Sequence, residues 1–134
     1  MNTKLLIIII SCALLFTSCA KSIHANLVGE WKGTNSSGST MSLLFESDST
    51  AKIVDKSIVV TGDNVRWSAN DDIEPFQLDI IISNRNGRTF TIPAIYRFIT
   101  EDKIQIRMSD DIRSRPIDFS DIDQKAQVIM LRQK

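Results

Sequence analysis

The chain has few of the residues that stabilise small secreted proteins or carry out chemistry in enzymes. Its 134 residues include two cysteines, Cys12 and Cys19, and one histidine, His24. Because no cysteine follows Cys19, the rest of the chain cannot be held by disulfides and must depend on its hydrophobic core. One histidine near the N-terminus supports neither a Ser-His-Asp or Cys-His arrangement nor a His/Cys metal cluster. We therefore expect no enzyme, no metal and no cofactor.

An excess charge of either sign is also missing. The 16 basic and 16 acidic residues cancel, and without Lys4 near the N-terminus the balance is one negative charge. This leaves no basic field for nucleic acid and no polybasic patch for an anionic lipid surface. Acidic runs at 71–74 and 118–123 offer oxygen atoms that suit Ca²⁺, but neither has the spacing of a known loop. We interpret both runs as solvated loops.

The longest apolar run lies at the N-terminus. Lys4 precedes an almost entirely apolar segment at 5–16. A membrane-spanning helix needs about 20 residues, so this length is typical of a signal peptide. The next residues, Phe16-Thr17-Ser18-Cys19, resemble the lipobox of bacterial lipoproteins, in which an apolar residue and two small ones precede the cysteine that receives the lipid.

Two alternatives stay open in this region. Ile9-Ile10-Ser11-Cys12 has the same spacing but leaves a very short apolar run, and an ordinary secretory signal would be cut near Ala20. The lipobox resemblance favours Cys19 and implies anchoring in the cell envelope, in the outer membrane of a cell with two membranes because Ala20 is not Asp. It divides the chain into a signal peptide at 1–18, a lipidated cysteine and tether at 19–26, and a domain at 27–134.

Beyond the tether the hydrophobic residues recur at every second position. Ile92, Ala94, Tyr96 and Phe98 share one face of such a segment, which is the signature of a half-buried strand. Short sequential connections favour an antiparallel meander, and a meander with one apolar face removes its edges by closing into a barrel. A sandwich is the alternative. We expect eight or nine strands, at about 27–33, 40–46, 50–55, 57–61, 64–69, 75–82, 88–99, 103–109 and 126–133.

Two local signals refine this prediction. Asn86-Gly87 suits a tight hairpin turn, because both central positions of a type I′ turn need positive φ. Pro93 lies inside a strand-like run and cannot donate a ladder hydrogen bond. It should therefore mark an edge, a bulge or a bend.

Two groups of residues resemble lipocalins and their calycin relatives. The first is Gly29-Glu30-Trp31, a Gly-x-Trp like the one in the opening strand of lipocalins. The resemblance implies that Trp31 plugs one end of a small barrel and that a basic residue of the last strand, here Arg132, lies over its ring. Such a cation contributes about 0.5–2 kcal/mol.

The second group lies in the other half of the chain. The order of the segments 75–80, 94–98, 102–106 and 115–119 resembles an uncharacterised family of bacterial lipocalin-like domains that is numerous in planctomycetes. This resemblance spans about 27–134 and implies a fold but no established activity.

Aromatic and arginine side chains are the candidates for binding. An eight-stranded barrel is just wide enough to be filled by side chains or to hold one small ligand, and so short a domain favours a filled core. Arginines near the segment after 108 suit an anionic ligand, with local ion pairs, such as one from Arg115 to Asp79, as the alternative. The candidate ligand-binding residues are Trp67, Tyr96, Phe98 and Arg107; the structural ones are Gly29, Trp31 and Arg132.

Together these features predict a lipid-anchored, non-catalytic binding module of the cell envelope. Its partners would be the membrane, through the lipid on Cys19, and either a small apolar ligand or an envelope protein. The alternative is a lipoprotein inhibitor or immunity protein that acts through surface loops on a secreted hydrolase or toxin.

Overall fold

Nine antiparallel strands make up almost all of the regular structure in the computed structural model, which describes residues 23–55, 59–60, 64–120 and 126–134. The signal peptide and Cys19 lie outside the described residues, as does part of the strand expected at 57–61. A short 3₁₀ helix, η1 (Ile23–Leu27), precedes the strands. The strands are β1 (Gly29–Asn35), β2 (Thr40–Phe45), β3 (Ala51–Asp55), β4 (Val59–Val60), β5 (Val65–Asn70), β6 (Phe76–Ser83), β7 (Thr89–Thr100), β8 (Lys103–Met108) and β9 (Gln127–Arg132).

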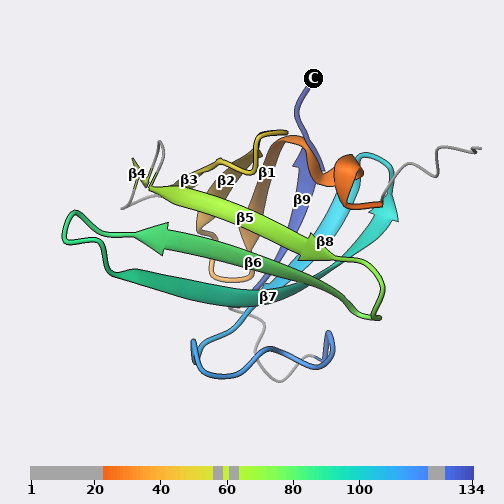
Figure 1. Ribbon diagram of the computed structural model, residues 1–134. Coiled ribbons are helices and arrows are strands. Elements are labelled where there is room, and N and C mark those ends of the chain that lie inside the picture. Colours follow the sequence, from red (N-terminus) through yellow and green to blue (C-terminus); the bar gives the residue numbers. More distant parts are fainter. Residues whose placement is uncertain (1–22, 56–58, 61–63, 121–125) are drawn as a thin grey trace, which may run out of the picture.

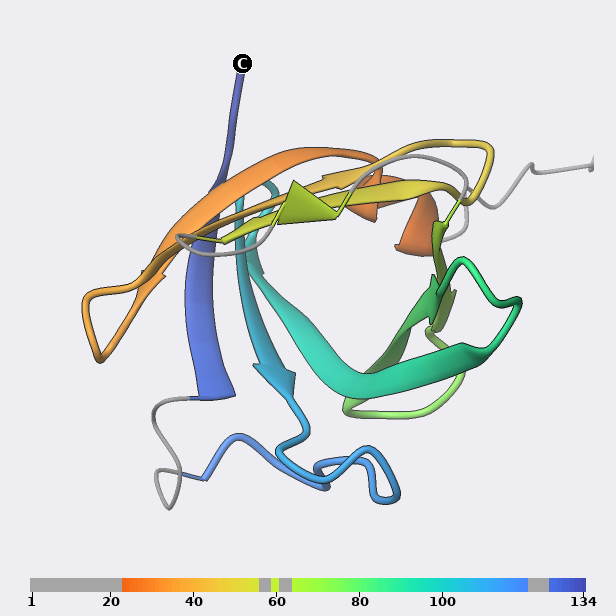
Figure 2. The same cartoon turned by 90° about the vertical axis from the view of Figure 1, so that its left-hand side faces the viewer.

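The strands form one antiparallel sheet that curls into a nearly closed barrel of lipocalin-like shape (Figures 1 and 2). Its order is β4-β3-β2-β1-β9-β8-β7-β6-β5, a meander in which the last strand pairs with the first. The two-residue β4 adds little, so eight longer strands make the wall. The predicted all-β barrel is confirmed, and the sandwich alternative is wrong because one sheet contains every named strand.

The barrel closes where β3 meets β5. A bridge joins Thr50 to Arg66, and the Trp67 backbone N–H donates to the Ser49 carbonyl oxygen at 2.9 Å. The Trp67 ring adds a hydrogen bond from Nε1 to the Glu46 carbonyl oxygen at 3.0 Å. Trp67 therefore fastens the seam of the barrel.

Large side chains fill the barrel interior. The inward-facing side chains of most strands have no accessible surface. Such side chains cannot line a void that is large enough to hold water. The predicted filled core is thus present among these residues. Those with 0% exposure include Trp31, Val65, Leu78, Ala94, Tyr96, Ile104, Ile106 and Met130.

The segment 109–120 lies against the outside of the barrel wall, as Figure 2 shows. Ile95 is only 1% exposed, although it alternates with the inward-facing Ala94 and Tyr96 and so points outward. Arg115 fixes the segment: its Nη1 donates to the carbonyl oxygens of Leu78 (3.0 Å) and Ala94 (2.7 Å). Its Nη2 binds Asp79 Oδ1 at 2.6 Å, which is the ion pair considered from the sequence.

Pro93 occupies a local edge, as expected. Strand β8 ends at Met108, opposite Ala94, and the Pro93 carbonyl accepts a hydrogen bond from the Ser109 N–H just beyond that end. The pairing of β7 with β8 ends at this point, so no strand residue of β8 needs a hydrogen bond from the N–H that proline lacks.

The tether expected at 19–26 overlaps η1 in part. Residues 23–26 were assigned to a tether, but they belong to η1, whose last residue Leu27 is fully buried. The Trp31 indole Nε1 donates to the Leu27 carbonyl oxygen at 2.8 Å and holds the helix against the barrel. The C-terminal part of η1 therefore contacts the barrel through Asn26 and Leu27.

Candidate functional site

The end of the barrel that carries η1 also carries the β2–β3, β5–β6 and β7–β8 connections (Figure 1). We call it the η1 end. Here the Arg132 guanidinium carbon lies 4.2 Å from the centroid of the Trp31 ring, the stacking that the lipocalin resemblance implied. Arg132 also donates to the carbonyl oxygens of Val28 (2.8 Å) and Asn26 (2.6 Å). Trp31 and Arg132 together close this part of the barrel end.

Gly29 is required by this arrangement for two reasons. Its φ is +131°, which L side chains rarely adopt. A Cβ at this position would also lie 2.8 Å from Arg132 Nη1. In this structure the glycine therefore leaves room for the arginine.

A row of aromatic rings crosses the η1 end. The centroids of Trp31 and Phe98 are 6.3 Å apart, those of Phe98 and Tyr96 5.9 Å, and those of Tyr96 and Phe76 5.5 Å. Strand β6 begins at Phe76, opposite Tyr96, so β7 continues from Arg97 to Thr100 without β6 beside it. This offset leaves a notch at the barrel wall.

The notch is a pocket of about 560 Å³, which we call the Phe98 pocket. Its volume falls within the usual range for small-molecule sites. Strand β7 provides one side, the β5–β6 connection a second, and Phe119 of the outer segment 109–120 a third. The lining residues are Glu74, Pro75, Phe76, Tyr96, Arg97, Phe98 and Phe119.

The Tyr96 hydroxyl beneath this pocket is buried and has no hydrogen-bond partner among the described residues. Burial raises the pKa of the phenol, and the charge of the Asp71 carboxylate raises it further. The group is therefore a neutral hydroxyl at physiological pH. An unsatisfied buried donor costs about 1–3 kcal/mol. Because the Tyr96 hydroxyl has almost no accessible surface, a ligand in the pocket reaches it only when the side chains around it move.

Two opposite charges stand at the pocket on different elements. Arg97 of β7 donates from Nε to Gln105 Oε1 at 2.8 Å, and its guanidinium carbon lies 4.6 Å from the Phe119 ring centroid. Glu74 belongs to the β5–β6 connection. Its carboxylate makes no ion pair within 4.0 Å with any residue that the structure describes, Arg97 included.

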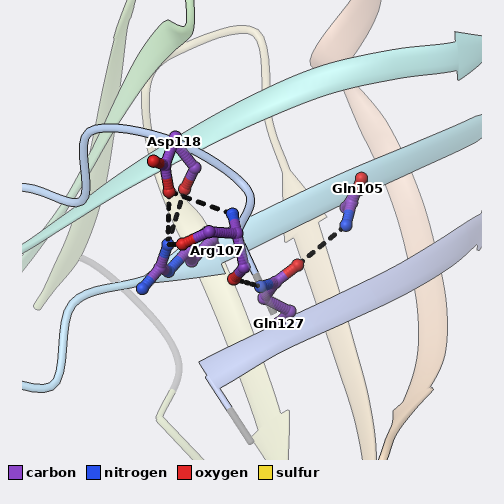
Figure 3. Close-up of polar contacts among 5 residues, drawn as sticks. Gln105, Arg107, Asp118 and Gln127 are labelled. Carbon is purple, nitrogen blue, oxygen red and sulfur yellow. Dashed lines mark hydrogen bonds and ion pairs between the residues drawn. The ribbon is translucent and has the colours of Figure 1, made fainter. Parts of the chain in front are cut away.

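Arg107 lies elsewhere, on the outer face of β8 (Figure 3). Its Nη1 binds the Asp118 carbonyl oxygen at 2.7 Å and Asp118 Oδ1 at 3.1 Å. The pKa of the Asp118 carboxyl lies below its usual value, mainly because the carboxylate accepts a hydrogen bond from the Ser120 N–H. The Arg107 charge lowers this pKa further. Gln127 Nε2 donates to the Ser120 carbonyl at 2.7 Å and accepts at Oε1 from Gln105 Nε2 at 2.9 Å. This network fastens the outer segment to β8 and β9.

The four candidate ligand residues therefore do not meet at one site. Tyr96 and Phe98 adjoin in the Phe98 pocket, Trp67 is part of the seam, and Arg107 holds the outer segment. Sequence reasoning missed Phe119, because no periodicity indicates that the segment after β8 folds back against β7. An aromatic residue in a segment interpreted as solvated was the only available signal.

Comparison with protein-family models, with curated proteins and with solved structures finds no match for this chain. The family resemblance therefore stays a prediction. Within the described ranges no helix has the length and hydrophobicity to span a membrane. Those same ranges contain no group of three or more His, Cys, Asp or Glu side chains arranged to hold a metal ion.

Proposed function

We propose that the protein is a lipid-anchored, non-catalytic binding module of the cell envelope and that the Phe98 pocket binds its ligand. The ligand is a small molecule with an apolar body and at least one hydrogen-bonding group. The observation that carries the proposal is the unpartnered Tyr96 hydroxyl, which is buried beside a pocket lined by Phe76, Phe98 and Phe119.

The barrel interior argues for this location of the ligand. Inward-facing side chains that have no accessible surface leave no room for a molecule between them. The Phe98 pocket instead opens at the η1 end, where Phe76, Phe98 and Phe119 offer apolar contact to an incoming ligand. Ligand sites of this kind combine apolar walls with a few polar groups that fix orientation.

The proposed anchor places this pocket close to the membrane. Four peptide steps separate Cys19 from Ile23, where η1 begins, and they span at most about 14 Å. The η1 end, with the Phe98 pocket, is then the end of the barrel nearest to the lipid surface. A ligand would be taken up or delivered at the membrane rather than far from it.

Fluorine NMR with 4-fluorobenzyl alcohol tests the binding site, using the mature lipidated chain in a maltoside detergent. The probe has an apolar ring and a hydroxyl that accepts a hydrogen bond from Tyr96. Phe119→Ala should weaken binding about tenfold, because it removes one aromatic side of the pocket. Phe90→Ala, at the other end of β7, is the control and should bind like the parent. Equal loss in both variants would contradict the proposal.

One observation favours the alternative of an inhibitor or immunity protein. The Ile117 side chain is 83% exposed. It lies only two residues after Arg115, whose side chain is fixed by three hydrogen bonds. A rigid segment that presents a large apolar side chain to solvent suits recognition of a protein partner. Loss of inhibition or of partner binding in Ile117→Ser, with 4-fluorobenzyl alcohol binding unchanged, would favour this second function.

A further inference from the structure

The charges at the Phe98 pocket define what kind of polar group its ligand carries. Glu74 and Arg97 line the same space from different elements, and no ion pair within 4.0 Å joins them. A pocket that carries one charge of each sign, with no ion pair between them, matches a ligand that also has one of each. A purely anionic or purely cationic ligand would meet one like charge.

The aromatic side chains favour a particular cation. Phe76, Phe98 and Phe119 line the pocket, and Arg97 already shows that the Phe119 ring accepts a positive group at 4.6 Å from its centroid. Alkylammonium groups interact with aromatic faces in the same way. The anionic half of the ligand would contact the Arg97 guanidinium, since only Nε is used by Gln105.

We propose that the Phe98 pocket binds a zwitterion that joins an alkylammonium group to a phosphate, with the ammonium beside Glu74 and the phosphate beside Arg97. This inference rests on the proposed function, because it specifies the ligand of the same pocket. Such a group occurs as a free metabolite and as a phospholipid headgroup. The short distance from η1 to the proposed lipid anchor makes the headgroup the expected source.

Titration calorimetry on the mature lipidated chain in a maltoside detergent separates the contributions of the two charges. The probes are phosphocholine, which carries both charges, choline, which carries only the cation, and methyl phosphate, which carries only the anion. Both charged side chains are exposed, so each contact contributes at most about 1 kcal/mol. Choline and methyl phosphate should each bind about fivefold more weakly than phosphocholine. Equal affinity for the three probes would overturn the proposal.

Charge-neutral variants assign the two contacts. Glu74→Gln should reduce the preference for phosphocholine over methyl phosphate, and Arg97→Gln should reduce the preference for phosphocholine over choline. Glu46→Gln and Arg88→Gln are the matched controls outside the pocket, and both should keep the parent preference. A preference for phosphocholine that is undiminished in both Glu74→Gln and Arg97→Gln would place the zwitterion elsewhere and refute the assignment.

The source of the ligand is tested in vesicles that hold the lipidated protein. Vesicles of phosphatidylcholine should suppress binding of added phosphocholine, whereas vesicles of phosphatidylglycerol should not. Equal binding in both would exclude the headgroup as the occupant. If 4-fluorobenzyl alcohol binds but phosphocholine has no advantage over its halves, the zwitterion proposal fails and the ligand pocket stands; if neither binds, the pocket itself is wrong.

Discussion

Replacing Tyr96 by phenylalanine should make the protein more stable and its pocket a poorer binder. The hydroxyl is buried without a partner among the described residues, and such a donor costs about 1–3 kcal/mol. Tyr96→Phe removes this atom and leaves a ring of the same shape between Phe76 and Phe98. We expect the free energy of unfolding to rise by about 1 kcal/mol, which raises Tm by about 4–8 °C in a domain of this size.

The same substitution should weaken the binding of 4-fluorobenzyl alcohol. The variant cannot donate a hydrogen bond to the probe, and one such bond contributes about 0.5–1.5 kcal/mol, or a factor of two to ten in Kd. Urea unfolding and fluorine NMR on the parent and the variant measure the two effects. A variant that is destabilised by 1 kcal/mol or more would refute the reasoning, because it would show that the hydroxyl has a partner in the free protein.

Three further substitutions test other parts of the structure. Cys19→Ser should abolish metabolic labelling with palmitate, and undiminished labelling would show that the lipid is attached elsewhere. Arg115→Met should lower the free energy of unfolding in urea by about 2–3 kcal/mol, because it removes hydrogen bonds from a partly buried cation; Arg113→Met is the control and should change it by less than about 0.5 kcal/mol. Gly33→Ala should cost about 3 kcal/mol in thermal unfolding, since its Cβ would lie 2.2 Å from the Ile129 carbonyl oxygen, and a parent-like Tm would contradict this packing.

The sequence predicted the barrel well because one physical signal repeats along the chain. A period of two assigns each side chain to the interior or the exterior, so strand positions follow from it to within about two residues. Strand β7 is an example: 88–99 was expected, and Thr89–Thr100 is observed. The Gly-x-Trp resemblance likewise placed Arg132 over Trp31, because that contact depends on the first and last strands of a closed barrel pairing side by side.

The remaining features depend on contacts without such a period. The outer segment 109–120 is polar and irregular, so no sequence pattern predicts that it packs against β6 and β7. The ion pair between Arg115 and Asp79 was the one contact that the sequence suggested. The same return supplies Phe119 to the Phe98 pocket. Helix η1 has only five residues, which is too short for a helical period to be recognised in the sequence. It is held in place by hydrogen bonds that its carbonyl oxygens accept from the Trp31 and Arg132 side chains.

The proposed ligand binds at the η1 end of a filled barrel, in the Phe98 pocket. Backbone amide NMR of the mature lipidated chain, titrated with phosphocholine, tests it most directly. We expect the amide signals of the pocket residues to shift together with one Kd, while those of the Asn84–Arg88 turn stay in place. The pocket residues are Glu74, Phe76, Arg97, Phe98 and Phe119. Shifts confined to that turn and its neighbours at the far end, or no shifts at all, would contradict it.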